Sequence, residues 1–365
     1  MLIARSPVRI SFGGGGTDLP AYYQKFGGAV LSTSINKYFY TILQKRNDGK
    51  IQVISSDLRV MESWRDITRM DIKSSELAIP LSAIKELGCN ISVDLFLASE
   101  IVAGTGLGSS ASVCVGVLKA LATYLDLPFS KHELAERSFH IARNILGKPV
   151  GKQDEYAAAF GGLNFITFNQ DGSTSVEPIV LRSDHLRELE SNLMLFFTGV
   201  AHDSWKLLQD QEQSTQSQVS STVESLHELR DLAERMRSSL LKGELREFGG
   251  LLHQGWEAKK RISSQISNSL IDEAYALARQ NGALGGKIAG AGGGGFLLLF
   301  CEEQQQDAVR QAMTKLRLRE MAFRLDFEGA EVVVNDPFID GDENCGMRWT
   351  FAPYLEVAST VNSLT

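Results

Sequence analysis

Three clusters of glycine constrain this chain more than any other feature of its sequence. They occupy residues 13–16, 104–108 and 290–295, and each lies where an apolar run ends or where a helix or strand is expected to begin. Glycine lets the backbone turn tightly and lets N–H groups converge on an anion without a Cβ atom in the way. For one cluster alone, a tight turn without a ligand is the better interpretation. Three clusters with polar neighbours favour a phosphate ligand.

Composition excludes several classes of protein. Hydrophobic residues make up 43% of the 365 residues and charged residues 22%, which indicates an ordered globular chain of about two domains. The formal net charge of −7 argues against a broad basic surface for nucleic acid or for anionic lipid. No apolar run approaches 18 residues and the N-terminus lacks a signal-peptide core, so we expect a cytoplasmic protein. The four cysteines share no metal-binding or disulfide-like spacing and are expected to be reduced thiols.

The order of the expected elements is that of an α+β fold. Alternating apolar runs predict strands in the first half, helices dominate 203–281, and a few strands follow. A boundary is expected near residues 180–190, and 336–365 lack clear periodicity. The expected strands are 2–12, 28–33, 37–46, 50–56, 91–99, 163–168, 173–180, 192–199, 284–289, 295–300, 321–327 and 330–334, and helices are expected at 111–125, 130–147 and 304–318.

The cluster at 104–108 is the most informative, because it lies between the strand at 91–99 and a helix that is apolar on nearly all sides. The free N–H groups at the start of that helix would face the loop and form a cradle for phosphate. Ser109 and Ser110 open the helix. One of these hydroxyls can cap the helix and the other can contact a metal ion or a phosphate.

Three other glycine motifs do not fit. A Walker A loop needs a Lys after its last glycine, and none follows Gly108. A nucleophile elbow needs G-x-S-x-G, and the second glycine is missing after Ser109 and Ser110. Gly290, Gly292 and Gly295 have the spacing of a dinucleotide fingerprint, but an apolar strand follows them where that motif requires a helix.

At these three places the sequence resembles the GHMP kinase superfamily. The matching segments are PVRISFGGGGTD (7–18), GTGLGSSA (104–111) and KIAGAGGGG (287–295), in the family's order and spacing. The resemblance implies a two-domain α+β fold, with an N-terminal domain like ribosomal-protein domain two over 1–185 and a ferredoxin-like C-terminal domain over 186–335, followed by an extension. It also implies an enzyme that uses ATP and Mg²⁺ on a small-molecule substrate.

Within the superfamily, the GGGGTD segment and GKQDEYAAAFGG (151–162) are most similar to D-glycero-D-manno-heptose 7-phosphate kinases. This similarity implies phosphorylation of the anomeric hydroxyl of heptose 7-phosphate to the 1,7-bisphosphate, on the route to nucleotide-activated heptose and surface polysaccharide. Two alternatives stay open. One is a kinase of an unphosphorylated hexose or deoxyhexose of the galactose, fucose or mannose type. The other is an inactive regulator that binds sugar or ATP on the same fold.

The resemblance also implies roles for single residues. Asp154 would be the base for the acceptor hydroxyl, with Arg9 as its basic partner, and Asp18 would bind sugar hydroxyls. As alternatives, Asp154 opens a helix at 155–160, Arg9 forms a surface ion pair, and Asp18 is a turn residue. ATP would contact Gly104, Gly106, Leu107, Gly108, Ser109 and Ser110, and the substrate would contact Gly15, Gly16, Thr17, Gly292 and Gly293.

The metal site departs from the family pattern. Ser110 would supply a hydroxyl to Mg²⁺, but Ala142 stands where the family often has a Glu, twelve residues before Asp154. Lys287 is interpreted as a surface lysine at a strand start. The candidates for an anchor of a substrate phosphate, among which the sequence does not choose, are Lys148, Lys152, Arg143 and His202.

Overall fold

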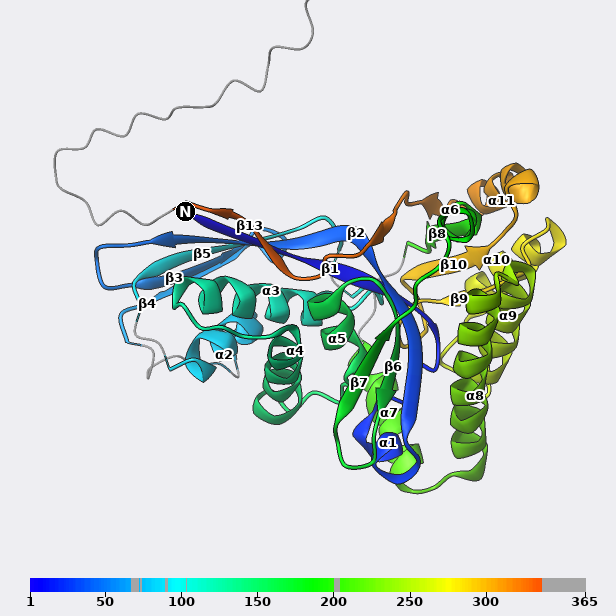
Figure 1. The fold of residues 1–365 in the computed structure, drawn as a ribbon, viewed down its shortest axis with the longest axis horizontal. Helices are drawn as coiled ribbons and strands as arrows, with labels where there is room; N and C mark the ends of the chain where they lie inside the picture. The colour runs from blue at the N-terminus through cyan, green and yellow to red at the C-terminus, as the bar shows by residue number, and fades with distance from the viewer. Residues whose placement is uncertain (67–71, 73, 89–90, 103, 200–203, 337–365) are drawn as a thin grey trace, which may run out of the picture. The chain divides into compact units, whose positions relative to one another are not determined.

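The alternating run at the N-terminus forms strand β1 (Leu2–Gly13), which pairs along its length with β2 (Gly28–Lys45) in the centre of a nine-stranded sheet (Figure 1). The computed structural model describes residues 1–66, 72, 74–88, 91–102, 104–199 and 204–336, and Met1–Asn335 form one compact unit. Apart from Asp336, the expected extension lies outside the described residues, as does His202.

The large sheet runs in the order β13-β1-β2-β5-β3-β4, and β6 and β12 also pair with β2. The β3–β5 pairing is parallel, while the other pairings of the described strands are antiparallel. Its remaining strands are β3 (Ile51–Ser55), β4 (Val60–Trp64), β5 (Val93–Ser99), β6 (Leu163–Phe168), β7 (Thr174–Pro178), β12 (Leu325–Asp326) and β13 (Glu331–Asn335).

Strand β2 unites two segments, 28–33 and 37–46, that the sequence predicts as separate strands. The polar residues between them do not break it, because Ser34 and Ile35 pair with β1 on one side and β12 on the other. A register shift in β1 between Pro7 and Val8 absorbs the irregularity.

Helices α2 (Ala78–Glu86), α3 (Ser109–Tyr124), α4 (Lys131–His140) and α5 (Gln153–Phe160) lie together on one side of this sheet (Figure 1). The prediction of a helix after the second glycine cluster is confirmed, and α3 is buried on most of its surface. The predicted capping box at Ser130 is also confirmed. The expected helix at 130–147 is α-helical to His140 and continues as the π-helical turn η2 (Ile141–Ile145).

A second sheet has four antiparallel strands in the order β11-β8-β10-β9. Alternation places Leu195 and Leu298 in a core with β1, α8 and α9, whereas Phe196 and Leu297 enter a core with α10 and α11. The elements of this region are α6 (Ser183–Asn192), β8 (Leu193–Phe197), α7 (Ser204–Gln216), α8 (Ser220–Lys242), α9 (Leu245–Lys260), α10 (Ser269–Gln280), β9 (Gly285–Ile288), β10 (Phe296–Phe300), α11 (Glu303–Lys315) and β11 (Arg319–Glu320).

The sequence analysis did not name α1 (Pro20–Phe26), α2, β4 and α6, which are all short. Among the described residues, no helix has the length and apolar character needed to cross a membrane. Cys114 and Cys301 are buried free thiols, as expected, while the other two cysteines lie outside the described residues.

Candidate active site

All three glycine clusters contribute to the wall of one cavity of about 350 Å³. Gly15 and Gly16 come from the first cluster, Gly104, Gly106 and Gly108 from the second, and Gly290 from the third. Its volume is within the usual range for a small-molecule site. The structure therefore brings together segments that lie up to 275 residues apart.

The second cluster, residues 104–110, is shaped by left-handed glycines. Gly104, Gly106 and Gly108 have φ values of 75°, 81° and 81°. A Cβ atom at Gly106 would lie 2.4 Å from the carbonyl oxygen of Ala289, so the loop is pressed against the third cluster. Only glycine combines this backbone conformation with this approach.

Helix α3 starts from this loop with its N-terminus at the cavity. The first N–H group to bond within the helix is that of Ser112, to Gly108 O at 3.1 Å, so helix geometry leaves the N–H groups of residues 109–111 without helical partners. The expectation that a serine hydroxyl caps the helix is wrong, because no side chain caps it. Ser109 Oγ is buried without a hydrogen-bond partner, and the exposed Ser110 lines the cavity.

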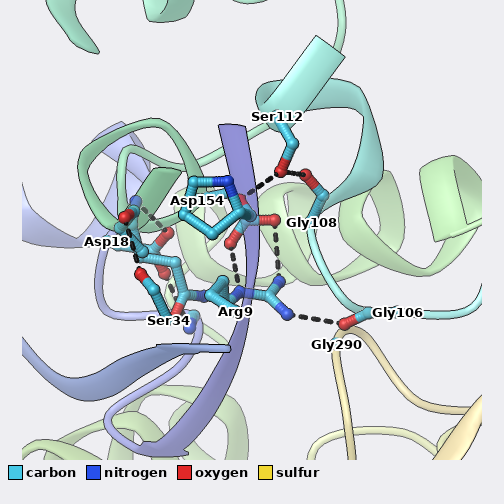
Figure 2. A network of polar contacts seen from close by, with 12 residues as sticks. Arg9, Asp18, Ser34, Gly106, Gly108, Ser112, Asp154 and Gly290 are labelled. Atoms are coloured by element: carbon cyan, nitrogen blue, oxygen red, sulfur yellow. Dashed lines mark hydrogen bonds and ion pairs between the residues drawn. The ribbon is translucent and has the colours of Figure 1, made fainter. Parts of the chain in front are cut away.

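Arg9 of β1 and Asp154 of α5 form a two-pronged ion pair (Figure 2). Arg9 Nε donates to Asp154 Oδ1 and Nη2 donates to Oδ2, each at 2.7 Å, while Nη1 donates to Gly106 O at 2.6 Å. The Arg9 side chain is 5% exposed and that of Asp154 is 28% exposed, so the carboxylate faces the cavity with the guanidinium behind it. Asp154 lies in the first turn of α5, but its oxygens accept from Arg9 and do not cap the helix.

Asp18 binds the start of the same helix. Its Oδ1 accepts from Gly16 N at 2.9 Å and its Oδ2 accepts from Gln153 N at 3.2 Å. A Cβ atom at Gly151 would lie 1.9 Å from Oδ2, so the carboxylate fills the space that glycine leaves there. Burial, and then the charge of Asp154, raise the pKa of Asp18 above its usual value.

Two lysines of the C-terminal half line the cavity as well. Lys259 of α9 and Lys287 of β9 are each 6% exposed, so the expectation of a surface position for Lys287 is wrong. The sequence holds a signal for Lys259, which continues the buried helical stripe of Phe248, Leu252 and Trp256 at spacings of three and four. Lys287 is preceded by two glycines and followed by an isoleucine, and its strand is buried throughout.

Most of the residues predicted for the site line this cavity, and four do not. Leu107 is part of the core, although its carbonyl accepts from Arg9 N at 2.9 Å. The Thr17 hydroxyl donates to Gly14 O inside the first loop. Gly292 and Gly293 pack on Ile266. The predicted residues that line it are Arg9, Gly15, Gly16, Asp18, Gly104, Gly106, Gly108, Ser109, Ser110 and Asp154.

Oxygen atoms of the kind that bind metal ions, from Glu155, Ser110 and Ser138, belong to residues that line the same cavity. Glu155 is 2% exposed, its Oε2 has no hydrogen-bond partner, and burial followed by the charge of Asp154 raises its pKa well above the usual value. Ser110, Ser138 and Ala142 line the cavity with it. Among the described residues, no group of three or more His, Cys, Asp and Glu side chains could hold a metal ion. A metal ion in this cavity would therefore also need hydroxyl oxygens and oxygens of a bound small molecule.

The residues that the sequence offers as anchors for a substrate phosphate differ in whether a carboxylate of the protein already pairs with them. Lys152 Nζ donates to Glu136 at 2.7 Å and to Gly172 O at 2.8 Å, and Arg143 is paired with Glu212. Lys148 lines the cavity, with its Nζ 4.6 Å from the centre of the Trp205 ring.

Comparisons with known proteins agree with this geometry. Profiles of the GHMP kinases N terminal domain and of the GHMP kinases C terminal region match residues 78–162 and 236–317. D-glycero-alpha-D-manno-heptose 7-phosphate kinase from Campylobacter jejuni is 33% identical over 79% of this chain and 86% of its own length. L-fucokinase/L-fucose-1-P guanylyltransferase from Bacteroides fragilis is 27% identical over 79% of this chain and 33% of its own length.

A solved structure described as a D-glycero-D-manno-heptose 1-phosphate kinase from Bacteroides thetaiotaomicron superposes with a TM-score of 0.77 at 28% identity. The match covers 92% of this chain and all of that chain. GHMP kinases use ATP, and the second glycine cluster, the Arg9–Asp154 pair and the third glycine cluster contribute to one cavity. The chain belongs to the GHMP kinase family, has its two-domain α+β fold, and is an ATP-dependent phosphotransferase.

Proposed function

We propose that the protein transfers the γ-phosphoryl group of ATP to the anomeric hydroxyl of D-glycero-D-manno-heptose 7-phosphate, giving the 1,7-bisphosphate. The observation that carries the reaction type is that the Asp154 carboxylate and the N-terminus of α3 face one cavity. The choice of sugar is supported by the GGGGTD and GKQDEY segments and by the heptose 7-phosphate kinase relative. The product would feed nucleotide-activated heptose and surface polysaccharide synthesis.

In this mechanism Asp154 accepts or orients the proton of the acceptor hydroxyl. The hydroxyl oxygen forms a bond to the γ-phosphorus, the bond between that phosphorus and the ADP oxygen breaks, and ADP leaves. Arg9 holds the carboxylate in place by donating two hydrogen bonds to it. Asp18, Gly15 and Gly16 would bind the sugar.

The phosphates of ATP would lie on the loop from Gly104 to Ser110, which we name the phosphate loop, with backbone N–H groups as donors. In this proposal Leu107, Gly292 and Gly293 act through the backbone and Thr17 through its hydroxyl, because they keep the loops in shape without lining the cavity. The Ser110 hydroxyl and the unpartnered oxygen of Glu155 would hold Mg²⁺, with Glu155 replacing the carboxylate that Ala142 lacks. Bound Mg²⁺ would neutralise phosphate charge and align the transferred group.

A substrate panel tests the proposal. ATP consumption is measured with heptose 7-phosphate, mannose, fucose and galactose, and we expect heptose 7-phosphate to have the highest kcat/KM. Turnover of an unphosphorylated sugar alone would support the second candidate, which the fucokinase relative favours. Failure with every sugar, with ATP binding retained, would contradict the proposal and favour an inactive regulator.

A further inference from the structure

Two buried ammonium groups share the cavity with Asp154 and lack a carboxylate partner. Lys259 and Lys287 are both 6% exposed, and the ion pairs of the described residues include neither of them. Lys259 Nζ donates to the carbonyl oxygen of Gly290. Burial and the neighbouring charge of Arg9 lower the pKa of Lys259 to about 8, and burial together with Lys259 lowers the pKa of Lys287 well below its usual value. The two lysines therefore disfavour each other's charge in the absence of an anion.

Arg9 has few donors left for a phosphate in this cavity. Its Nε and Nη2 donate to Asp154 and its Nη1 donates to Gly106 O, so the protein occupies three of its five N–H donors. Each lysine ammonium, in contrast, carries three N–H donors. Among the described residues, the carbonyl oxygen of Gly290 is the only protein acceptor for these two ammonium groups, and it accepts from Lys259.

Both lysines are connected to the loop of residues 104–110 through Gly290, Lys259 by a hydrogen bond and Lys287 by the chain. Lys287 comes three residues before Gly290, whose added Cβ would lie 2.6 Å from Gly106 Cα. On the other side of the loop, a Cβ at Gly108 would lie 3.1 Å from Asp154 Oδ2. The lysines, the loop of residues 104–110 and the candidate base therefore line the same cavity.

We propose that Lys259 and Lys287 bind the phosphoryl group while it passes from ATP to the acceptor. This inference rests on the proposed function and adds two catalytic residues to it. Negative charge is spread over the three equatorial oxygens of the group in transit, and donors aimed at those oxygens lower the barrier. A phosphate group already present on the acceptor carries similar negative charge and would suit the same two lysines. The experiment distinguishes that phosphate from the transferred phosphoryl group.

The test compares Lys259→Met and Lys287→Met with Lys260→Met. Lys260 is the matched control, because it neighbours Lys259 in α9 but is paired with Glu257 and lies outside the cavity. Calorimetry measures the binding of ADP, of AMP-PNP, and of ADP with aluminium fluoride, which imitates the phosphoryl group in transit. We expect every variant to bind ADP within about 2-fold of the parent, which also shows that it is folded. The two cavity variants should bind the aluminium fluoride complex about 100-fold more weakly, and their kcat should fall by about as much.

Other results would overturn the inference. Parent-like binding of the aluminium fluoride complex by both cavity variants would remove the lysines from the transferred group. A higher KM for heptose 7-phosphate alone, with an unchanged kcat, would assign them to the phosphate of the acceptor. If the parent phosphorylates no sugar, the proposed function fails, but the comparison of ADP with AMP-PNP needs no acceptor and still tests the lysines. If both variants then keep the parent's preference for AMP-PNP over ADP, the proposed role of the two lysines is wrong.

Discussion

Arg9 and Asp154 are joined by two hydrogen bonds of 2.7 Å although 145 residues separate them in the sequence. The pair connects the first strand of the sheet to the first turn of α5, and Arg9 also donates to the carbonyl of Gly106 in the phosphate loop. One guanidinium therefore positions the candidate base relative to the loop that would hold ATP (Figure 2).

Replacing Gly106 by Ala should weaken nucleotide binding. The new Cβ would meet the Ala289 carbonyl at 2.4 Å in a backbone conformation that side chains rarely adopt, so the phosphate loop must shift. We expect the Kd for ATP to rise by about 10-fold or more, measured by calorimetry. The control is Gly49→Ala, which has the same sign of φ but meets no atom within 4 Å. Equal effects of the two substitutions on ATP binding would show that contact between the loops is unimportant.

Replacing Glu155 by Gln should weaken the binding of the metal ion. The change keeps the shape of the side chain and removes the carboxylate that we assign to Mg²⁺. We expect the Mg²⁺ concentration needed for half-maximal thermal stabilisation of the ADP complex to rise by about 10-fold. Glu133→Gln is the control, because that residue belongs to the capping box of α4, outside the cavity. An unchanged Mg²⁺ requirement would exclude Glu155 as a ligand.

The lowered pKa of Lys259 has consequences for folding and for binding. The pKa is about 8 in the folded protein and 10.5 in the free side chain, so the folded state binds fewer protons between these values. The Lys259 contribution to the stability of the ligand-free protein should therefore increase from pH 8 to pH 10.5, by an amount on the order of 3 kcal/mol, and its full cost should be present below pH 8. Chemical denaturation at a series of pH values should show a smaller increase in Lys259→Met than in the parent, because Lys287, whose pKa is also lowered, keeps its own contribution.

The same titration should appear when an anion binds. Burial and then the charge of Arg9 lower the pKa of Lys259, Asp18 and Asp154 raise it, and a bound phosphate would raise it further. Binding of AMP-PNP at pH 8.5 should take up protons, measured by calorimetry in buffers of different ionisation enthalpy. Proton uptake of the same size in Lys259→Met would assign the titration to another group.

The sequence was sufficient for most of the fold because its strongest patterns are local. The alternating runs that became β1 and β5, the apolar run that became β10, and the capping box at Ser130 depend on neighbours in the chain. Strand β2 was divided in two because its polar middle is held by pairing with distant strands. No local pattern contains that information.

The site was predictable where glycine or the family resemblance marked it, and less so elsewhere. The structure brings Arg9, Asp18 and Asp154 to one cavity with the phosphate loop, as the resemblance implies. Lys259 and Lys287 were missed as cavity residues because lysines are usually exposed and because α9 and β9, which carry them, meet only after folding. The roles of all these residues stay predictions.

Phosphoryl transfer by Asp154→Asn is the most direct test of the account, which requires the carboxylate to act on the acceptor hydroxyl. Single-turnover transfer from ATP to heptose 7-phosphate should fall by about 1000-fold or more, while ATP binding should stay within about 2-fold. Asp171→Asn, in an exposed turn outside the cavity, serves as the control and should transfer at the parental rate. A transfer rate near the parental value in Asp154→Asn would contradict the account.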